Sequence, residues 1–328
     1  MRVIFTHALR SAAAGVFVFS VAACGGAGQV PQRGTLSNLS DRGASTLTIA
    51  PAVLQTPALI SNNSRSGELE YWPISSKGGK SPQSFTKHLG VHGGQMAANG
   101  SLLAIAAADI VLYDTSNGQV QHMADPNGTP YDIAIDKAGA LYSLHFTNKP
   151  PATVSMFAPG SHAVRKLVCS AVNIAEEIAV DNESDVFIGG WGTHFPGIWE
   201  IPAGSQGSCE HLDLKYSQGP SGLAVDPKTD DLITLDNPSQ CAGGEEGRMI
   251  IYPKPYQEET AQVHVLGGNC TSGLKLNADS TIVFYGDGDV CGCNFFIRQS
   301  TYPDGHPMHA YYGGVPGGWT TIPNSLPN

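Results

Sequence analysis

The sequence has few charged residues and no basic cluster. Only 14% of its 328 residues are Asp, Glu, Lys or Arg, and the formal net charge is −10. Nucleic acids and anionic lipid surfaces are bound by concentrated positive charge. The composition therefore excludes a nucleic-acid partner and a polybasic membrane-binding surface.

Long apolar runs and common catalytic motifs are also missing. The uncharged stretch at residues 11–23 has roughly 13 residues, whereas a bilayer-spanning helix needs ~20. The chain contains no G-x-S-x-G or H-E-x-x-H motif, and the glycine-rich GGVPGG segment precedes no strand-to-helix transition. The sequence thus gives no support for a nucleophile-elbow hydrolase, a zinc protease or a phosphate-binding loop.

Glycine, proline and hydrophobic residues indicate a folded chain of short strands and turns. Glycine and proline together account for 61 of the 328 residues. This share is below the roughly 25–30% that is typical of disordered low-complexity chains. Hydrophobic residues make up 41% of the sequence, which is enough for a sizeable core. This composition favours an all-β protein.

The N-terminus has the pattern of an export signal. Arg2 and Arg10 precede the apolar stretch at residues 11–23, which is typical of a signal peptide. The following Val21-Ala22-Ala23-Cys24 resembles a bacterial lipobox, which implies lipidation of Cys24 after removal of residues 1–23. An ordinary secretory signal cut near Ala23 is the alternative. Residues 24–57 are rich in Gly, Ser, Thr and Pro, and we expect a flexible tether. The predicted location is the cell envelope, with a membrane anchor.

An internal repeat predicts the fold. The segments GTPYDIAID, NIAEEIAVD and GPSGLAVD end 45 residues apart, at Asp136, Asp181 and Asp226, and weaker copies end at Asn99 and Asn277. A period of ~40–50 residues is typical of propeller blades. We interpret the terminal aspartate as a turn residue that accepts hydrogen bonds from backbone N–H groups.

Each repeat contains four short apolar runs separated by turns, which indicates a four-stranded blade. The first unit, near residue 58, lacks its first strand, and the segment VPGGWTTIPN near the C-terminus can supply it. We therefore predict a six-bladed β-propeller of four-stranded antiparallel blades over residues 58–323, closed by the C-terminal strand joining the first blade. Residues 324–328 form a tail.

Two motifs in the repeat are similar to those of known propellers. The G-x-P-x-x-[IL]-A-[VI]-D strand and the following [IV]-x-x-[YF]-x-P-G strand resemble NHL-repeat and SMP-30-like six-bladed propellers. The resemblance implies a ligand face over the central channel, where enzymes of these families hold a divalent cation or zinc. No motif here matches their ligand sets residue by residue, so no catalytic residue is assigned.

Six cysteines follow Cys24, and an even number in an exported chain indicates disulfides. They are Cys169, Cys209, Cys241, Cys270, Cys291 and Cys293. We predict that two bonds join Cys241 and Cys270 to Cys291 and Cys293, because all four fall on one face of the propeller. The pair Cys169 and Cys209 remains by exclusion. A zinc site made by the four clustered cysteines is the alternative.

The predicted axial face carries the second-to-third-strand loops and the starts of the first strands. Its polar and aromatic residues come from several blades. They are His92, His145, Glu176, Glu177, Trp191, His194, Asp236 and Asp287. Imidazole and carboxylate groups suit zinc, and oxygen ligands suit calcium, so either ion is a candidate cofactor. Trp191, flanked by glycines, can stack on a sugar or peptide ring, although polar loops are common in any soluble protein.

Two functions follow from these residues. The first is a lipid-anchored, non-catalytic binding or scaffold module of the cell envelope, with a protein, peptide or glycan ligand. The alternative is a divalent-metal-dependent hydrolase or lyase that acts at the axial face. The sequence leaves catalytic activity open between them.

Overall fold

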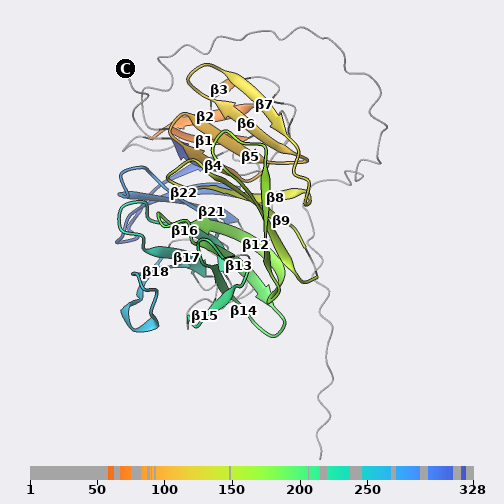
Figure 1. The fold of residues 1–328 in the computed structure, drawn as a ribbon. Helices are drawn as coiled ribbons and strands as arrows, with labels where there is room; N and C mark the ends of the chain where they lie inside the picture. Colours follow the sequence, from red (N-terminus) through yellow and green to blue (C-terminus); the bar gives the residue numbers. More distant parts are fainter. Residues whose placement is uncertain are drawn as a thin grey trace, which may run out of the picture. The chain divides into compact units, whose positions relative to one another are not determined.

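The structure is a computed structural model, and it describes the strands and most connections between residues 58 and 322 (Figure 1). The described residues are 58–62, 67–74, 83–86, 89, 91, 94–147, 149–205, 207–214, 220–236, 246–266, 271–288, 295–312 and 319–322. The predicted signal peptide, Cys24, the tether and the C-terminal tail lie outside them. Within these ranges, no helix is both long enough and apolar enough to cross a membrane.

The described strands form six four-stranded sheets, numbered here in chain order. Sheet 1 contains β1 (Ala58–Asn62), β2 (Leu69–Pro73), β3 (Gln83–Thr86) and β24 (Trp319–Ile322). Sheet 2 contains β4 (Met96–Asn99), β5 (Leu102–Ala106), β6 (Ile110–Asp114) and β7 (Gln119–Met123). Sheet 3 contains β8 (Pro130–Ile135), β9 (Leu141–His145), β10 (Ala152–Phe157) and β11 (Val164–Cys169).

The other three sheets repeat the same pattern. Sheet 4 contains β12 (Val172–Val180), β13 (Val186–Gly192), β14 (Pro196–Ile201) and β15 (Glu210–Leu212). Sheet 5 contains β16 (Pro220–Val225), β17 (Leu232–Asp236), β18 (Arg248–Tyr252) and β19 (Gln262–Val265), with the short 3₁₀ helix η2 (Glu258–Thr260) before β19. Sheet 6 contains β20 (Thr271–Leu276), β21 (Ile282–Gly288), β22 (Phe295–Thr301) and β23 (Pro307–Tyr312).

All the sheets are antiparallel, and five of them pair strands in chain order. Sheet 1 differs, because β24 is hydrogen-bonded to β1, with Ile322 opposite Ala58 and Trp319 opposite Ser61. The first strands of neighbouring sheets contact one another in the order β24, β4, β8, β12, β16 and β20, and β20 also contacts β24. Four-stranded antiparallel blades with their first strands together are the β-propeller architecture that the repeat predicts.

Burial along the strands explains the apolar runs in the sequence. All residues of the second strands β9 and β17 are buried, because neighbouring sheets cover both faces. Such strands are continuous apolar runs rather than alternating ones. The outermost strand β7 has the sequence QVQHM and is exposed except at Met123. Polar residues on an edge strand discourage pairing with other chains.

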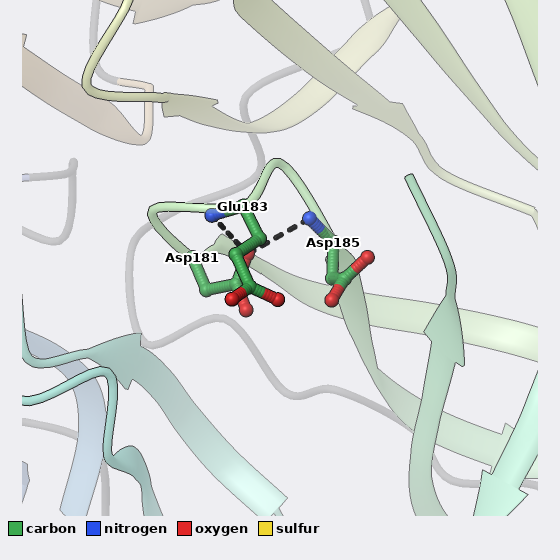
Figure 2. A group of neighbouring side chains, drawn as sticks. All are labelled: Asp181, Glu183 and Asp185. Carbon is green, nitrogen blue, oxygen red and sulfur yellow. Dashed lines mark hydrogen bonds between the residues drawn. The ribbon is translucent and has the colours of Figure 1, made fainter. Parts of the chain in front are cut away.

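The repeated aspartates hold the turns after the first strands. Figure 2 shows that Asp181 accepts hydrogen bonds from the backbone N–H groups of Glu183 and Asp185, at 2.9 and 2.8 Å. Asp136 accepts one from the N–H of Ala140, at 2.8 Å. Asp136 also accepts a bond from the hydroxyl of Ser184 in sheet 4, at 3.0 Å. The structure thus confirms the turn interpretation and adds a link from each turn to the next sheet.

Asp181 and Asp226 make the same kind of link. Lys254 and Tyr256, which follow β18 in sheet 5, donate to Asp181 at 3.0 and 3.2 Å. Ser280 of sheet 6 donates to Asp226 at 2.5 Å. The repeat motif therefore encodes a bond between sheets as well as a turn within one.

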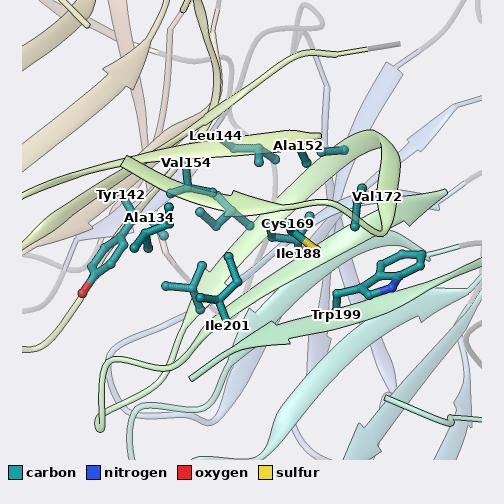
Figure 3. Close-up of a cluster of buried hydrophobic side chains, with 14 of the residues drawn as sticks. Ala134, Tyr142, Leu144, Ala152, Val154, Cys169, Val172, Ile188, Trp199 and Ile201 are labelled. Atoms are coloured by element: carbon teal, nitrogen blue, oxygen red, sulfur yellow. The ribbon is translucent and has the colours of Figure 1, made fainter. Parts of the chain in front are cut away.

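Six clusters of buried apolar side chains lie between successive sheets. The cluster between sheets 3 and 4 is drawn in Figure 3. Its labelled members include Leu144 and Val154 of sheet 3, and Ile188 and Trp199 of sheet 4. Another cluster joins Trp72 of sheet 1 to Phe284 and Tyr311 of sheet 6. The core is therefore distributed over the interfaces between sheets rather than gathered in one place.

A disulfide joins sheets 3 and 4 at their outer strands. Cys169 ends β11, and Cys209 lies directly before β15. Gly207 has a positive φ and passes so close to the backbone of Val168 that a Cβ would lie 2.7 Å from its carbonyl oxygen. The pairing of Cys169 with Cys209 is confirmed. Closing a loop of 40 residues contributes about 4 kcal/mol on the chain-entropy estimate. The other four predicted disulfide cysteines lie outside the described residues.

Candidate functional site

Two β-bulges at equivalent places of sheets 3 and 4 position the central residues of the site. The register of β8 against β9 shifts between Pro130 and Asp132, so that Tyr131 is the extra residue. The register of β12 against β13 shifts between Ala175 and Glu177, so that Glu176 is the extra residue. Bulges bend a strand and redirect its side chains. They bring acidic and aromatic groups of neighbouring sheets together.

Asp132 and Glu177 form a carboxyl pair across the interface of sheets 3 and 4. Asp132 is 1% exposed and accepts hydrogen bonds from the N–H groups of Ile133 at 2.7 Å and Ile178 at 2.8 Å. Burial raises the pKa of Glu177 well above its usual range, and the neighbouring Asp132 carboxylate raises it further. The hydrogen bond between the two side chains raises the pKa of Glu177 and lowers that of Asp132, so it favours Glu177 as the donor.

Lys275 supplies the positive charge that balances this pair. It occupies the position held by Ala97, Ala134, Ala179 and Ala224 in the other repeats, and all five residues line one cavity. Burial raises the pKa of Asp132, and the Lys275 ammonium opposes that rise; it also opposes the rise at Glu177. A single lysine of sheet 6 thus stabilises carboxyl groups of sheets 3 and 4.

Replacing Glu177 with glutamine should remove a pH dependence of stability. A raised pKa means that the folded protein keeps a proton that the unfolded chain loses, so stability falls as pH rises through the folded pKa of Glu177. One such group gives a slope of at most about 1.4 kcal/mol per pH unit. We expect Glu177→Gln to flatten the fall in stability between the ordinary pKa of a glutamate and the raised pKa of Glu177, because the amide still donates to Asp132. Urea unfolding at a series of pH values measures this.

The matched control for that substitution is Glu183→Gln. Glu183 has a side chain that is 67% exposed, so its neutralisation should leave the shape of the profile unchanged. Parallel profiles for wild type and Glu177→Gln would show that Glu177 does not hold a proton in the folded protein.

Aromatic side chains lie beside the carboxyl pair. The rings of Tyr131 and Phe146 are 5.2 Å apart between centroids and tilted by 47°, and the two residues are 40% and 57% exposed. Burial and the nearby acidic groups Glu177 and Glu176 raise the pKa of Tyr131 to about 12. Trp191 is partly buried, and its side chain is hydrogen-bonded to Glu176. We call Tyr131, Phe146, Glu176 and Trp191 the aromatic–acidic patch.

Glu176 is the carboxyl group of the patch that the structure leaves partly exposed. Burial raises its pKa, and the hydrogen bond from Trp191 opposes that rise. Among the described residues, no lysine, arginine or histidine forms an ion pair with it. The patch therefore combines two exposed aromatic rings with one carboxylate that has no salt-bridge partner in the described part of the chain.

Another predicted site residue, His145, is buried in a polar network. Its Nε2 lies 2.8 Å from Asp125 Oδ2, and its Nδ1 lies 2.7 Å from Thr153 Oγ1. Ser155 donates to the other Asp125 oxygen at 2.6 Å. Both ring nitrogens of His145 are thus engaged by neighbouring side chains, and the network fixes the segment before β8 onto β9 and β10.

Two predicted carboxylates have arginine partners on the adjacent strand. Asp236 forms an ion pair with Arg248, its register partner on β18. Asp287 forms an ion pair with Arg298 on β22, at 2.5 Å. His194 is exposed in the turn between β13 and β14, and His92 lies outside the described residues. Of the eight predicted residues, the structure brings Glu176, Glu177 and Trp191 together.

The acidic turn at Asp181 has the ligand spacing of a metal site but already contains a cation. Carboxylate oxygens of Asp181, Glu183 and Asp185 lie within 4.8 Å of one another (Figure 2). Lys254 Nζ lies 3.0 Å from Asp181 and 2.9 Å from Glu183. The ammonium group balances the cluster, which we assign to stability.

A cavity of about 420 Å³ lies at the carboxyl-terminal ends of the first strands. It is lined by the carboxyl-terminal parts of β4, β8, β12, β16 and β20 and by the turns that follow them. None of the eight predicted site residues lines this cavity.

Sequence reasoning missed Tyr131, Asp132, Phe146 and Lys275. Aligned repeats hold a signal for one of them: Lys275 stands where the other repeats have alanine, whereas Asp132 stands where they have Gln95, Glu177, Gly222 and Gly273. A charged residue at a position that is otherwise small and buried indicates a specific partner. Tyr131 and Phe146 carry no comparable signal, since exposed aromatics cannot be told from buried ones by spacing.

Comparisons with known proteins support the fold. No protein-family model and no curated protein matches the chain. A structure from a crystal of a nidogen/laminin complex is 14% identical with a TM-score of 0.66, covering 82% of this chain and 100% of that one. TolB from Acinetobacter baumannii is also 14% identical, with a TM-score of 0.59, covering 81% of this chain and 66% of that one. The fold is a β-propeller. At this identity, the likenesses establish nothing beyond it.

Proposed function

We propose that this β-propeller is an exported, lipid-anchored binding or scaffold module of the cell envelope that recognises a protein partner. The lipobox-like segment before Cys24 and the uncharged stretch at residues 11–23 support export and anchoring. The similarity to a chain from a nidogen/laminin complex supports binding to another protein.

The scaffold we propose is a closed, six-bladed ring of the NHL and SMP-30-like kind. Its support is the pairing of β24 with β1 and the buried cluster that joins sheet 6 to sheet 1. The repeat motif ending at Asp136, Asp181 and Asp226 adds the resemblance. Closure by the last strand removes two open sheet edges.

The aromatic–acidic patch is the binding surface, and its exposed aromatic pair is the observation that carries the proposal. Tyr131 and Phe146 are exposed rings in contact with each other, Glu176 acts electrostatically on Tyr131, and Trp191 is hydrogen-bonded to Glu176. Exposed aromatic side chains that lie together mark interaction sites, because the partner supplies the cover that the fold does not.

In-cell photo-crosslinking tests this assignment. A benzophenone side chain at Phe146 in the full-length protein should capture an envelope protein, and Trp191→Ala in the same chain should lower the yield. The matched control is a benzophenone at Val265, which has the same exposed fraction of 57% but lies on β19. Equal capture from both positions, or no effect of Trp191→Ala, contradicts the assignment.

Cys24→Ser provides the test of anchoring in the same cells. Loss of the lipidated cysteine should move the protein from the membrane fraction to the soluble fraction and lower capture at Phe146. An unchanged membrane fraction would contradict the lipid anchor.

We do not propose the metal-dependent hydrolase or lyase. Among its described candidate ligands, His145, Asp236 and Asp287 are engaged by Asp125, Arg248 and Arg298. A divalent ion would have to displace these partners from the buried carboxylates.

A further inference from the structure

We propose that the aromatic–acidic patch binds a cationic side chain, the lysine or arginine of an extended segment of the partner protein. This inference rests on the proposed function and names the chemistry that the patch recognises. It follows from the ring faces, from the charge of the patch and from the position of its carboxylate.

The two exposed rings give the patch its cation-binding faces. Tyr131 and Phe146 lie 5.2 Å apart between centroids, and 40% and 57% of their surfaces are open to solvent. An ammonium or guanidinium group is attracted to the face of an aromatic ring, and the attraction grows as water is removed.

The charge of the patch calls for one additional cation. Lys275 is the cation whose charge acts on Asp132 and Glu177. That leaves Glu176, which has no ion-pair partner among the described lysines, arginines and histidines. The hydrogen bond from Trp191 holds the Glu176 carboxylate in place. A cationic side chain over the rings would complete the pair.

The same chemistry separates this ligand from others. An anionic ligand would be repelled by Glu176 and by the formal net charge of −10. A sugar ring can stack on Tyr131 and Phe146, but stacking does not require a carboxylate charge and changes little with salt. Dependence on Glu176 and on ionic strength therefore identifies a cation.

The test uses the full-length protein in detergent and an acetylated Gly-Lys-Gly-Arg-Gly peptide, titrated by calorimetry. We expect binding that weakens with added salt and that falls about tenfold in Glu176→Gln and in Phe146→Ala. Phe146 is exposed, so its removal leaves the core intact, and thermal unfolding checks this. Glu210→Gln is the matched control, because Glu210 is an exposed acid on the outer strand β15.

Other ligands and outcomes separate the two proposals. Equal binding of Gly-Ser-Gly-Ser-Gly, or chitotetraose binding that is unaffected by Glu176→Gln, overturns the cationic ligand. If the peptide fails to bind while crosslinking at Phe146 still depends on Trp191, only the ligand class is wrong. If both experiments fail, the proposed function is wrong as well.

Discussion

Deleting residues 319–328 should abolish cooperative folding. The deletion removes β24, the first strand of sheet 1, and exposes the edge of β1 to which it is hydrogen-bonded. Ala58, Leu59 and Ile60 of β1 are all 0% exposed, and they would lose a neighbouring strand. The proposed ring would open on two edges, and we expect a loss comparable to the whole stability of a domain, on the order of 5–15 kcal/mol. Circular dichroism during heating measures the transition.

The control for this deletion is a shorter one that removes residues 324–328 and leaves β24 intact. It should unfold at the same temperature as the full chain. If the longer deletion also keeps an unchanged, cooperative transition, β24 does not close the ring.

Asp181→Ala should be the most damaging single substitution that we can identify outside the apolar core. Asp181 is 2% exposed and accepts four hydrogen bonds, from the backbone of its own turn and from Lys254 and Tyr256 of the next sheet. Hydrogen bonds with Glu183 and Asp181 raise the pKa of Lys254 despite its desolvation, which acts the other way. Removing the carboxylate leaves these donors without their acceptor.

The expected cost of Asp181→Ala is about 3–5 kcal/mol, because a buried acceptor of four hydrogen bonds is lost. Asp181→Asn keeps one acceptor oxygen and should cost less. Glu183→Gln, which removes the exposed partner of the same Lys254, should change stability by no more than about 1 kcal/mol. Urea denaturation of the three variants measures the order. Equal effects of Asp181→Ala and Glu183→Gln would refute the inter-sheet link.

The sequence predicts the sheets well because one motif performs two tasks. Asp136, Asp181 and Asp226 each hold a turn within their sheet and accept a donor from the next. A residue type under two constraints recurs at a fixed period, and the period reveals the blades. The pairing of β24 with β1 was predictable for a related reason, since the first unit has no first strand of its own.

The site was less predictable, because its residues depart from the repeat. Glu176 and Glu177 were found from their place at the start of a first strand, but the partner of Glu177 is Asp132 in the neighbouring sheet. Asp236 looked available for a ligand because Arg248 is 12 residues away in sequence. The strand register places them opposite each other, and that register cannot be obtained from spacing alone.

The disulfide between Cys169 and Cys209 has a mechanical consequence for recognition. It ties β11 to the segment before β15, and the aromatic–acidic patch is built on the same two sheets. Thermal opening that separates other sheets would leave Tyr131 and Glu176 at a fixed spacing. A partner then meets a surface whose ordering is already complete, so less entropy is lost when it binds. In an oxidising compartment the crosslink would preserve this rigidity. Reduction of the disulfide would make the patch more mobile and weaken binding before it unfolded the protein.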